Sequence, residues 1–229
     1  MQGDADIAAA AALLAEPARA ALVTAVIADG ALPVTDLADR AHIAPSTASE
    51  HLRRLVAGGF LSSEKRGRHR YYELADPAVA AAVEALALVA PQPPVRSLRE
   101  ATRSELLREA RTCYDHLAGK VGVALAQSLE RERVLVRRNG DYTLGSRAAA
   151  RLEELGIDLA PLERLRRPVV RGCLDWSERE LHVAGSLGAA LADRFFELGW
   201  IRRRDGNRSV EVTAQGCAGF SDELGVSHS

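Results

Sequence analysis

Two segments in the second half of the chain carry the same set of chemically reactive side chains. Each has the pattern Arg-x-Cys-x-Asp, and a histidine follows it, directly in the first copy and after a six-residue insertion in the second. The members are Arg111, Cys113, Asp115 and His116 in the first copy and Arg171, Cys173, Asp175, Trp176 and His182 in the second. Thiolate and imidazole bind soft metal ions, whereas paired arginines bind anionic organic molecules. The pattern predicts an effector site, provided that the fold unites the two copies.

A metal ion is the more demanding of the two effector hypotheses. Cys113 and His116 supply only two ligands within one copy, so Cys173 and His182 of the other copy must complete the set. A small organic effector has no such requirement. The residues identify no resident cofactor, and they favour a small organic effector over a metal or metalloid ion.

The same residues also admit a structural interpretation. Asp115 and Asp175 suit the caps of helices expected after them, and Ser177 and Glu180 have the spacing of a capping box. Cysteine often packs as a small core residue, which is the role expected for Cys217. Cys, His and Asp also form nucleophilic triads, but here every group recurs in both copies and the sequence contains no nucleophile elbow. The chain is therefore not expected to be an enzyme.

These segments belong to an internal repeat with an offset of 66 residues. His116-Leu-Ala-Gly-Lys-Val-Gly returns as His182-Val-Ala-Gly-Ser-Leu-Gly, and residues 134–138 match residues 200–204. Turns at Asn139-Gly140 and Asp205-Gly206 predict a hairpin in each repeat. The repeats, at 111–157 and 171–226, are each expected to fold as helix, hairpin and helix. The glycines of the repeated helix are expected to let helices approach closely; they are Gly119, Gly122, Gly185 and Gly188.

A proline-rich segment separates these repeats from the N-terminal part of the chain. Pro91-Gln92-Pro93-Pro94 cannot continue the alanine-rich helix that precedes it. The expected division is a DNA-binding and dimerisation domain at 1–90, a linker at 91–95 and a duplicated regulatory domain at 96–229. The expected fold class is mainly α with small β-hairpins.

Proline and glycine positions predict the elements of the first domain. Helices are expected at 7–14, 18–28, 34–40, 45–57 and 77–90. Strands are expected at 60–65 and 70–74, with 66–69 as the tip of a hairpin. This order of helices followed by a hairpin is that of a winged helix-turn-helix, in which residues 45–57 form the recognition helix.

The recognition helix and the hairpin carry a local excess of positive charge. Ala48, Leu52 and Leu55 recur at helical spacing and are expected to face the core. Basic side chains on the outer surface would neutralise DNA phosphates. Glu50 is the exception, because it either accepts a hydrogen bond from a cytosine amino group or lies outside the interface. The predicted DNA-binding residues are Ser46, Thr47, Ser49, Glu50, His51, Arg53, Arg54, Lys65, Arg66, Arg68 and Arg70.

Four motifs follow one another over the first 90 or so residues. They are Val34-Thr-Asp-Leu-Ala-Asp-Arg, Ala44-Pro-Ser-Thr-Ala-Ser-Glu-His-Leu-Arg-Arg-Leu, Gly58-Gly-Phe-Leu and Gly67-Arg-His-Arg-Tyr-Tyr-Glu-Leu. Together they resemble the arsenic-repressor-type (ArsR/SmtB) winged-helix family. The resemblance implies a homodimeric repressor that an effector releases from an inverted-repeat operator in double-stranded DNA. Metal-sensing members carry a cysteine in the first helix of the helix-turn-helix, and Leu32-Pro-Val-Thr-Asp has none, so sensing at that position is excluded.

Composition limits the remaining classes of function. The 229 residues are 47% hydrophobic with a net charge of -1, which excludes a disordered chain and one that coats nucleic acid through its overall charge. Without a signal peptide or a membrane-spanning run, a cytoplasmic protein with reduced thiols and no membrane partner is expected. Residues 8–14 and 79–90, within the first and last of these helices, are rich in small and aliphatic residues and are the expected dimer interface. Two alternatives remain, a DNA-tethered protein-interaction module and a cysteine-dependent enzyme fused to a winged helix.

Overall fold

A computed structural model describes residues 5–91, 94–204 and 207–226, of which the majority are helical, with 53% helix and 20% strand. The chain divides into two compact units, residues 1–84 and 85–229. This boundary lies within a helix, Pro77–Val89, whereas the sequence predicts it at Pro91. Gln92 and Pro93 of the predicted linker, and the predicted turn at Asp205-Gly206, lie outside the described residues.

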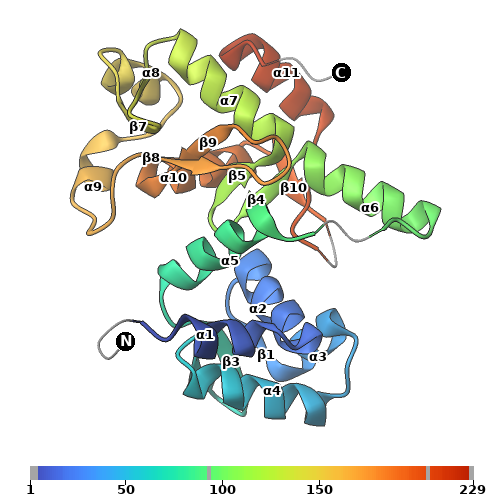
Figure 1. Cartoon of the computed structure of the whole chain (residues 1–229). Coiled ribbons are helices and arrows are strands. Elements are labelled where there is room, and N and C mark those ends of the chain that lie inside the picture. The colour runs from blue at the N-terminus through green and yellow to red at the C-terminus, as the bar shows by residue number, and fades with distance from the viewer. Residues whose placement is uncertain (1–4, 92–93, 205–206, 227–229) are drawn as a thin grey trace. The chain divides into compact units, whose positions relative to one another are not determined.

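The first unit has the element order of a winged helix-turn-helix (Figure 1). Its elements are α1 (Ile7–Leu14), α2 (Pro17–Asp29), β1 (Leu32–Pro33), α3 (Val34–Ala41), α4 (Pro45–Ala57), β2 (Leu61–Arg66), β3 (His69–Leu74) and α5 (Pro77–Val89), which continues into the second unit. The strands form an antiparallel sheet in the order β1-β3-β2. The helices agree with the sequence prediction to within one residue at each end, but the short strand β1 was not predicted.

Proline and glycine set the ends of these elements as expected. Pro17 and Pro45 occupy the first turns of α2 and α4, where a missing N–H costs nothing. The strands of the hairpin extend further than predicted, since Arg66 pairs with His69. Only two residues therefore form the tip, and Gly67 there has φ +61°, which suits glycine.

Ala48, Leu52 and Leu55 of α4 are fully buried, as their spacing predicts. They pack in a core that also contains Leu22 of α2 and Leu37 of α3, because these three helices contact one another. Burial of one face of α4 leaves its opposite face in solvent, which is the arrangement that a recognition helix needs.

The second unit is built from hairpins alternating with helices. Its elements are α6 (Leu98–Glu109), β4 (Arg111–Cys113), β5 (His116–Ala118), α7 (Gly119–Arg131), β6 (Leu135–Arg138), β7 (Asp141–Leu144), α8 (Ala148–Glu154), α9 (Leu159–Glu163), β8 (Arg171–Leu174), β9 (Leu181–Ala184), α10 (Gly185–Glu197), β10 (Ile201–Arg203), β11 (Val210–Val212) and α11 (Ala214–Leu224). The order hairpin, helix, hairpin, helix occurs twice.

Each repeat begins with a hairpin that the sequence analysis assigned to a helix. His116 lies on β5 and His182 on β9, so the prediction of helix, hairpin and helix is wrong at its start. The helices begin three residues later, at Gly119 and Gly185. These glycines have φ of +79° and +87°, in the left-handed region that glycine adopts without strain, and they turn the chain from strand into helix.

The two repeats pack crosswise. Helix α7 of the first repeat contacts β9 of the second, α10 of the second contacts β5 of the first, and β5 lies against β9 (Figure 1). A Cβ atom added to Gly122 would lie 3.6 Å from Cβ of His182, and one added to Gly188 would lie 3.1 Å from Cβ of His116. The nearest atoms would be the carbonyl oxygens of Leu117 and Val183, at 2.5 Å in each case, so these glycines admit the preceding strand of their own repeat rather than a neighbouring helix as predicted.

The core of the second unit extends beyond this crossing. Phe195, Trp200 and Phe220 form an aromatic cluster, in which the first two rings are stacked at a centroid distance of 5.4 Å. Across the described residues, no single helix is long and apolar enough to cross a membrane. The pair α1 and α2 reaches that length and composition only when joined across a bend of 89°.

Candidate metal centre and nucleic-acid interface

Two antiparallel hairpins position the reactive side chains of the second unit. In β4–β5, Cys113 is the direct partner of His116, and in β8–β9, Cys173 is the direct partner of His182. Directly opposed residues of an antiparallel pair place their side chains on the same face. Each hairpin thus presents one thiol beside one imidazole. The insertion in the second repeat lengthens only the connection between its strands.

The two hairpins bring these four groups into one cluster. The Sγ atoms of Cys113 and Cys173 are 3.9 Å apart, and the Nε2 atoms of His116 and His182 are 3.2 Å apart. The four potential ligand atoms all lie within 4.8 Å of one another, and three of the four residues are buried while Cys173 is half-buried. Residues that are 60 and 66 positions apart in the sequence therefore form a single centre.

Each imidazole has an aspartate at its other ring nitrogen. Oδ1 of Asp115 lies 3.1 Å from Nδ1 of His116, and Oδ2 of Asp175 lies 3.3 Å from Nδ1 of His182. Carboxylates in this position fix the orientation of an imidazole and leave Nε2 as the atom that can bind a cation.

The structural interpretation predicts that Asp175 caps a helix of its own repeat, and this prediction is wrong. A strand follows it, and its Oδ2 accepts a hydrogen bond of 2.7 Å from the N–H of Gly119, the first residue of α7 in the other repeat. The predicted capping box of Ser177 and Glu180 is also wrong. Ser177 lies in a turn, where its N–H and Oγ both donate to Oδ1 of Asp175.

Asp115 is likewise followed by a strand instead of the expected helix. It forms an ion pair of 2.5 Å with Arg167, whose guanidinium also donates to the carbonyl oxygen of Gly185. Arg167 lies ahead of the second Arg-x-Cys-x-Asp segment, and sequence analysis missed it because neither spacing nor repetition marks it.

Arg111 makes the corresponding contact to the other aspartate. It is fully buried and forms an ion pair of 2.9 Å with Asp175. Its guanidinium also lies over the ring of Trp176, 4.5 Å from the centroid. Arg171, in contrast, is exposed on β8, and in the described part of the chain it has no ion pair. The predicted pair of arginines is thus divided between the interior and the surface. Cys217 is exposed, so the core-packing role predicted for it is wrong.

Hydrogen bonds within the cluster favour an ionised thiol at Cys173. The hydrogen bond to Cys113 lowers the pKa of Cys173 to about 2 and raises that of Cys113, where burial adds to the rise. Burial opposes ionisation of Asp175, but His182 and Arg111 hold its pKa well below the usual range. Burial also lowers the pKa of His182, yet its contacts to Asp175 and Cys173 raise the pKa overall. The cluster therefore stabilises a thiolate, the form of cysteine that binds metals.

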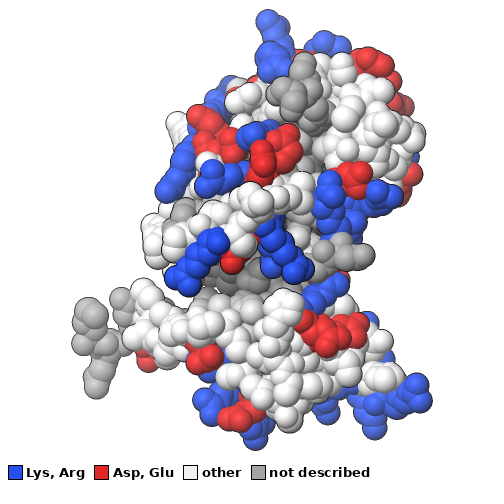
Figure 2. Space-filling model, turned by 90° about the vertical axis from the view of Figure 1, so that its right-hand side faces the viewer, with Lys and Arg blue, Asp and Glu red and all other residues white. Residues whose placement is uncertain are grey.

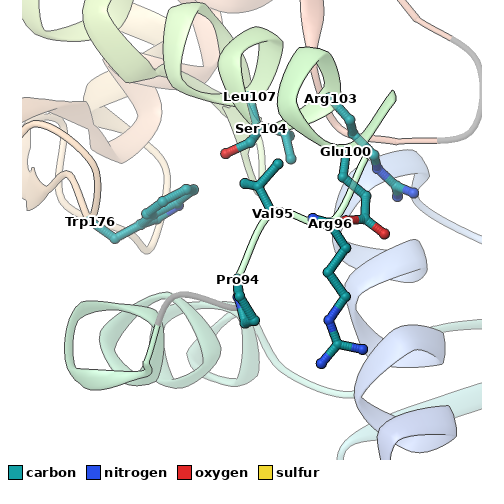
Figure 3. Close-up of a pocket in the computed structure, with 8 residues that line it drawn as sticks. All are labelled: Pro94, Val95, Arg96, Glu100, Arg103, Ser104, Leu107 and Trp176. Atoms are coloured by element: carbon teal, nitrogen blue, oxygen red, sulfur yellow. Dashed lines mark hydrogen bonds between the residues drawn. The ribbon is translucent and has the colours of Figure 1, made fainter. Parts of the chain in front are cut away.

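A pocket of about 540 Å³ lies on the other side of Trp176. Figure 3 shows the indole at one side of the pocket, facing Val95, with Ser104 and Leu107 of α6 above them. Among the described residues, the indole Nε1 atom is buried and has no hydrogen-bond partner. The other lining residues are Pro94, Arg96, Glu100 and Arg103. Sequence analysis did not predict this pocket, because its lining comes from α6, the preceding segment and a distant turn.

The predicted DNA-binding residues lie on the surface of the first unit. All are exposed except His51, which is half-buried. Three of them have partners within α4: the hydroxyl of Ser49 donates to the carbonyl oxygen of Pro45, and Glu50 forms an ion pair of 2.7 Å with Arg54. Glu50 thus partly neutralises the positive charge of α4. Ser46 and Thr47 are exposed in the first turn of this helix.

The hairpin contributes the remaining basic side chains. Arg66 pairs with Glu64 at 2.6 Å and also lies over the ring of Tyr71, while Arg70 donates to the hydroxyl of Ser63. Arg68 is exposed at the tip of the hairpin. Figure 2 shows basic side chains projecting from this unit with acidic groups between them. The surface therefore offers separate cationic contacts rather than one continuous positive field.

A relative of known sequence matches nearly the whole chain. A protein of Bacillus subtilis (strain 168), described as the uncharacterized HTH-type transcriptional regulator YdfF, is 42% identical over 215 residues, which cover 93% of this chain and 95% of that protein. The chain belongs to this helix-turn-helix family of transcriptional regulators. Residues 14–64 also match the family described as a helix-turn-helix domain.

Solved winged-helix structures resemble the N-terminal region of this regulator. The homodimeric winged helix-turn-helix domain of Mb0332 from Mycobacterium bovis, a possible ArsR-family regulator, is 26% identical, covering 39% of this chain and 89% of that chain with a TM-score of 0.33. A possible transcriptional regulator for arsenical resistance is 39% identical, covering 33% and 76% with a TM-score of 0.29. The family match of residues 14–64 and the relative in Bacillus subtilis confirm the predicted kinship of the N-terminal region with helix-turn-helix regulators.

Proposed function

We propose that this regulator is a homodimeric repressor that binds an inverted-repeat operator and leaves it when an effector binds in the second unit. The main support is the division of labour between the units. The first has a recognition helix with a buried face and an exposed face. The second unit contains a buried cluster of ionisable groups, which does not contact DNA in the proposed mode of binding and is therefore free to serve regulation.

Exposed apolar surface on two helices supports the dimer. No residue of α1 is buried, although the helix consists only of Ile, Ala and Leu. On α5, Leu86 and Val89 are 48% and 80% exposed. A second copy of this chain is the proposed partner for both helices, because the dimer would place two recognition helices one helical turn, about 34 Å, apart on DNA.

Fluorescence anisotropy with the regulator's own promoter, together with light scattering, tests this function. The expected result is a dimer that protects two half-sites and needs no other protein. A monomer that protects one asymmetric half-site would contradict the proposal. A requirement for a second protein would instead support the interaction-module alternative.

A specific observation favours a small organic molecule as the effector. Trp176, whose buried indole N–H has no hydrogen-bond partner among the described residues, borders a pocket of ligand size, and its ring contacts Arg111, which pairs with Asp175. A ligand with a hydrogen-bond acceptor would satisfy this N–H. An effector changes DNA affinity only if it binds two conformations of the protein with different affinity.

Trp176→Phe tests this role, because phenylalanine keeps an aromatic ring beside Arg111 but removes the N–H donor together with the volume of the second ring. The variant should bind the operator like the parent and require a higher concentration of inducing extract for release. Trp200→Phe changes the other tryptophan of the second unit and serves as the control. Equal induction of both variants and the parent would argue against effector binding at the indole.

A further inference from the structure

The sulfur–sulfur and nitrogen–nitrogen separations within the cysteine–histidine cluster match those of a tetrahedral metal site. In such a site, metal–sulfur bonds of about 2.3 Å and metal–nitrogen bonds of about 2.0–2.1 Å separate the two sulfur atoms by about 3.8 Å and the two nitrogen atoms by about 3.3 Å. The corresponding distances here are 3.9 Å between Cys113 and Cys173 and 3.2 Å between His116 and His182. The two sulfur atoms and the two nitrogen atoms are thus each spaced for coordination, and all four ligand atoms lie within 4.8 Å of one another.

The arrangement of protons points to a cation as well. Asp115 and Asp175 lie 3.1 Å and 3.3 Å from the Nδ1 atoms of the two histidines, so that a hydrogen on each Nδ1 would leave a lone pair on each Nε2. Two lone pairs at 3.2 Å repel each other unless a proton or a metal ion lies between them. A metal ion satisfies both imidazoles and both sulfur atoms at once, whereas one shared proton satisfies only the imidazoles.

We propose that Cys113, His116, Cys173 and His182 bind one divalent ion of the zinc class, with one sulfur and one nitrogen ligand from each repeat. Two sulfur and two nitrogen ligands in tetrahedral geometry select Zn²⁺ over the harder ions that prefer oxygen. All four positions are filled by the protein, as in closed structural zinc sites. Asp115 and Asp175 serve as second-layer partners that orient the two imidazoles.

The centre goes beyond the proposed repressor function and does not depend on it. All four ligands belong to the second unit, and each repeat supplies only half of the set. The ion therefore joins the two hairpins, and its binding energy stabilises the packing of one repeat against the other.

Titration of the reduced, metal-stripped full-length chain with Co²⁺ tests the site without DNA. The expected result is one Co²⁺ per chain, with the intense visible bands of tetrahedral coordination, a sulfur-to-cobalt charge-transfer band and displacement of Co²⁺ by Zn²⁺. Cys173→Ser should abolish these bands. Cys217→Ser, which changes the exposed third cysteine, should leave them unchanged.

A second variant covers the case in which Cys173→Ser disturbs folding. Asp115→Asn keeps all four ligands, and it should weaken Zn²⁺ binding by about 10- to 100-fold while leaving the shape of the Co²⁺ spectrum unchanged. Absence of bound metal in the folded parent, octahedral bands, or equal binding by the parent and Cys173→Ser would each overturn the proposal. A Cys113–Cys173 disulfide that forms in preference to metal binding would overturn it too. None of these results bears on operator binding, which is measured separately.

Discussion

Replacement of Arg111 by alanine should destabilise the second unit and leave the first unit intact. Arg111 and Asp175 are both fully buried and form an ion pair of 2.9 Å. The guanidinium also donates to the carbonyl oxygen of Leu107 and to the hydroxyl of Ser177. Arg111→Ala would leave the carboxylate of Asp175 in the interior without its cation, while its hydrogen bonds to backbone N–H groups remain.

Removal of one partner of a buried ion pair costs about 3–5 kcal/mol of unfolding free energy. With a urea dependence of about 2 kcal/mol/M, the unfolding midpoint of the second unit should fall by about 1.5–2.5 M. Both tryptophans of the chain, Trp176 and Trp200, lie in the second unit, so tryptophan fluorescence follows the unfolding of this unit alone. Circular dichroism detects the helices of both units. It should show a lower urea midpoint for the second unit and an unchanged midpoint for the first unit.

Arg171→Ala is the matched control, because Arg171 occupies the equivalent position of the sequence repeat but lies on the surface. A substitution at such a surface site changes stability by no more than about 0.5 kcal/mol. If Arg111→Ala and Arg171→Ala unfold at the same urea concentration by fluorescence, then the ion pair with Asp175 does not support the unit and the reasoning from burial fails.

Three more substitutions test separate parts of the molecule. Arg68→Ala should weaken binding to every DNA sequence and reduce the slope of log affinity against log salt by about 0.9, whereas Arg138→Ala should not; an unchanged slope would place the hairpin tip off the DNA. Leu86→Glu should give a monomer by light scattering, since a carboxylate at the proposed dimer interface costs several kcal/mol, and a persistent dimer would locate the interface elsewhere. Gly188→Ala places a Cβ atom 2.5 Å from the carbonyl oxygen of Val183 and should lower the unfolding free energy of the second unit by about 1–3 kcal/mol. A urea midpoint by tryptophan fluorescence equal to that of the parent would contradict this prediction.

The first unit was largely predictable because local signals determine it. Prolines at helix starts, the glycine at the hairpin tip and the spacing of Ala48, Leu52 and Leu55 all agree with the final packing. The short strand β1 escaped prediction because two residues carry no periodic pattern. In the second unit, the periodicity after His116 was assigned to a helix three residues too early, since nothing in the apolar pattern marks where a strand gives way to a helix. The left-handed glycines at 119 and 185 mark that point in the structure.

The repeated sequence motif predicted that its cysteines, histidines and aspartates lie together, as they do in the structure. Of its two arginines, only Arg111 contacts them in the described part of the chain. Equivalent positions in the two copies suggested that Arg111 and Arg171 act together. In the structure, Arg111 pairs with Asp175, and the matching contact to Asp115 comes from Arg167. The repeat in sequence preserves the strands and their pairing, but Arg167 rather than Arg171, the equivalent of Arg111, reaches the carboxylate of Asp115. Only the tertiary structure contains that information.

The crossed contacts explain why the cluster and the packing of the two repeats depend on each other. Arg111 of the first repeat reaches Asp175 of the second, and Arg167, ahead of the second repeat, reaches Asp115 of the first. The carboxylates in turn contact His182 and His116. Separation of the repeats would break both chains of contacts and divide the ligand set in half. A ligand that binds only the packed form at 100 times its dissociation constant stabilises that form by about 2.7 kcal/mol. Metal bound to the four side chains would therefore strengthen the same interface that the ion pairs already hold together.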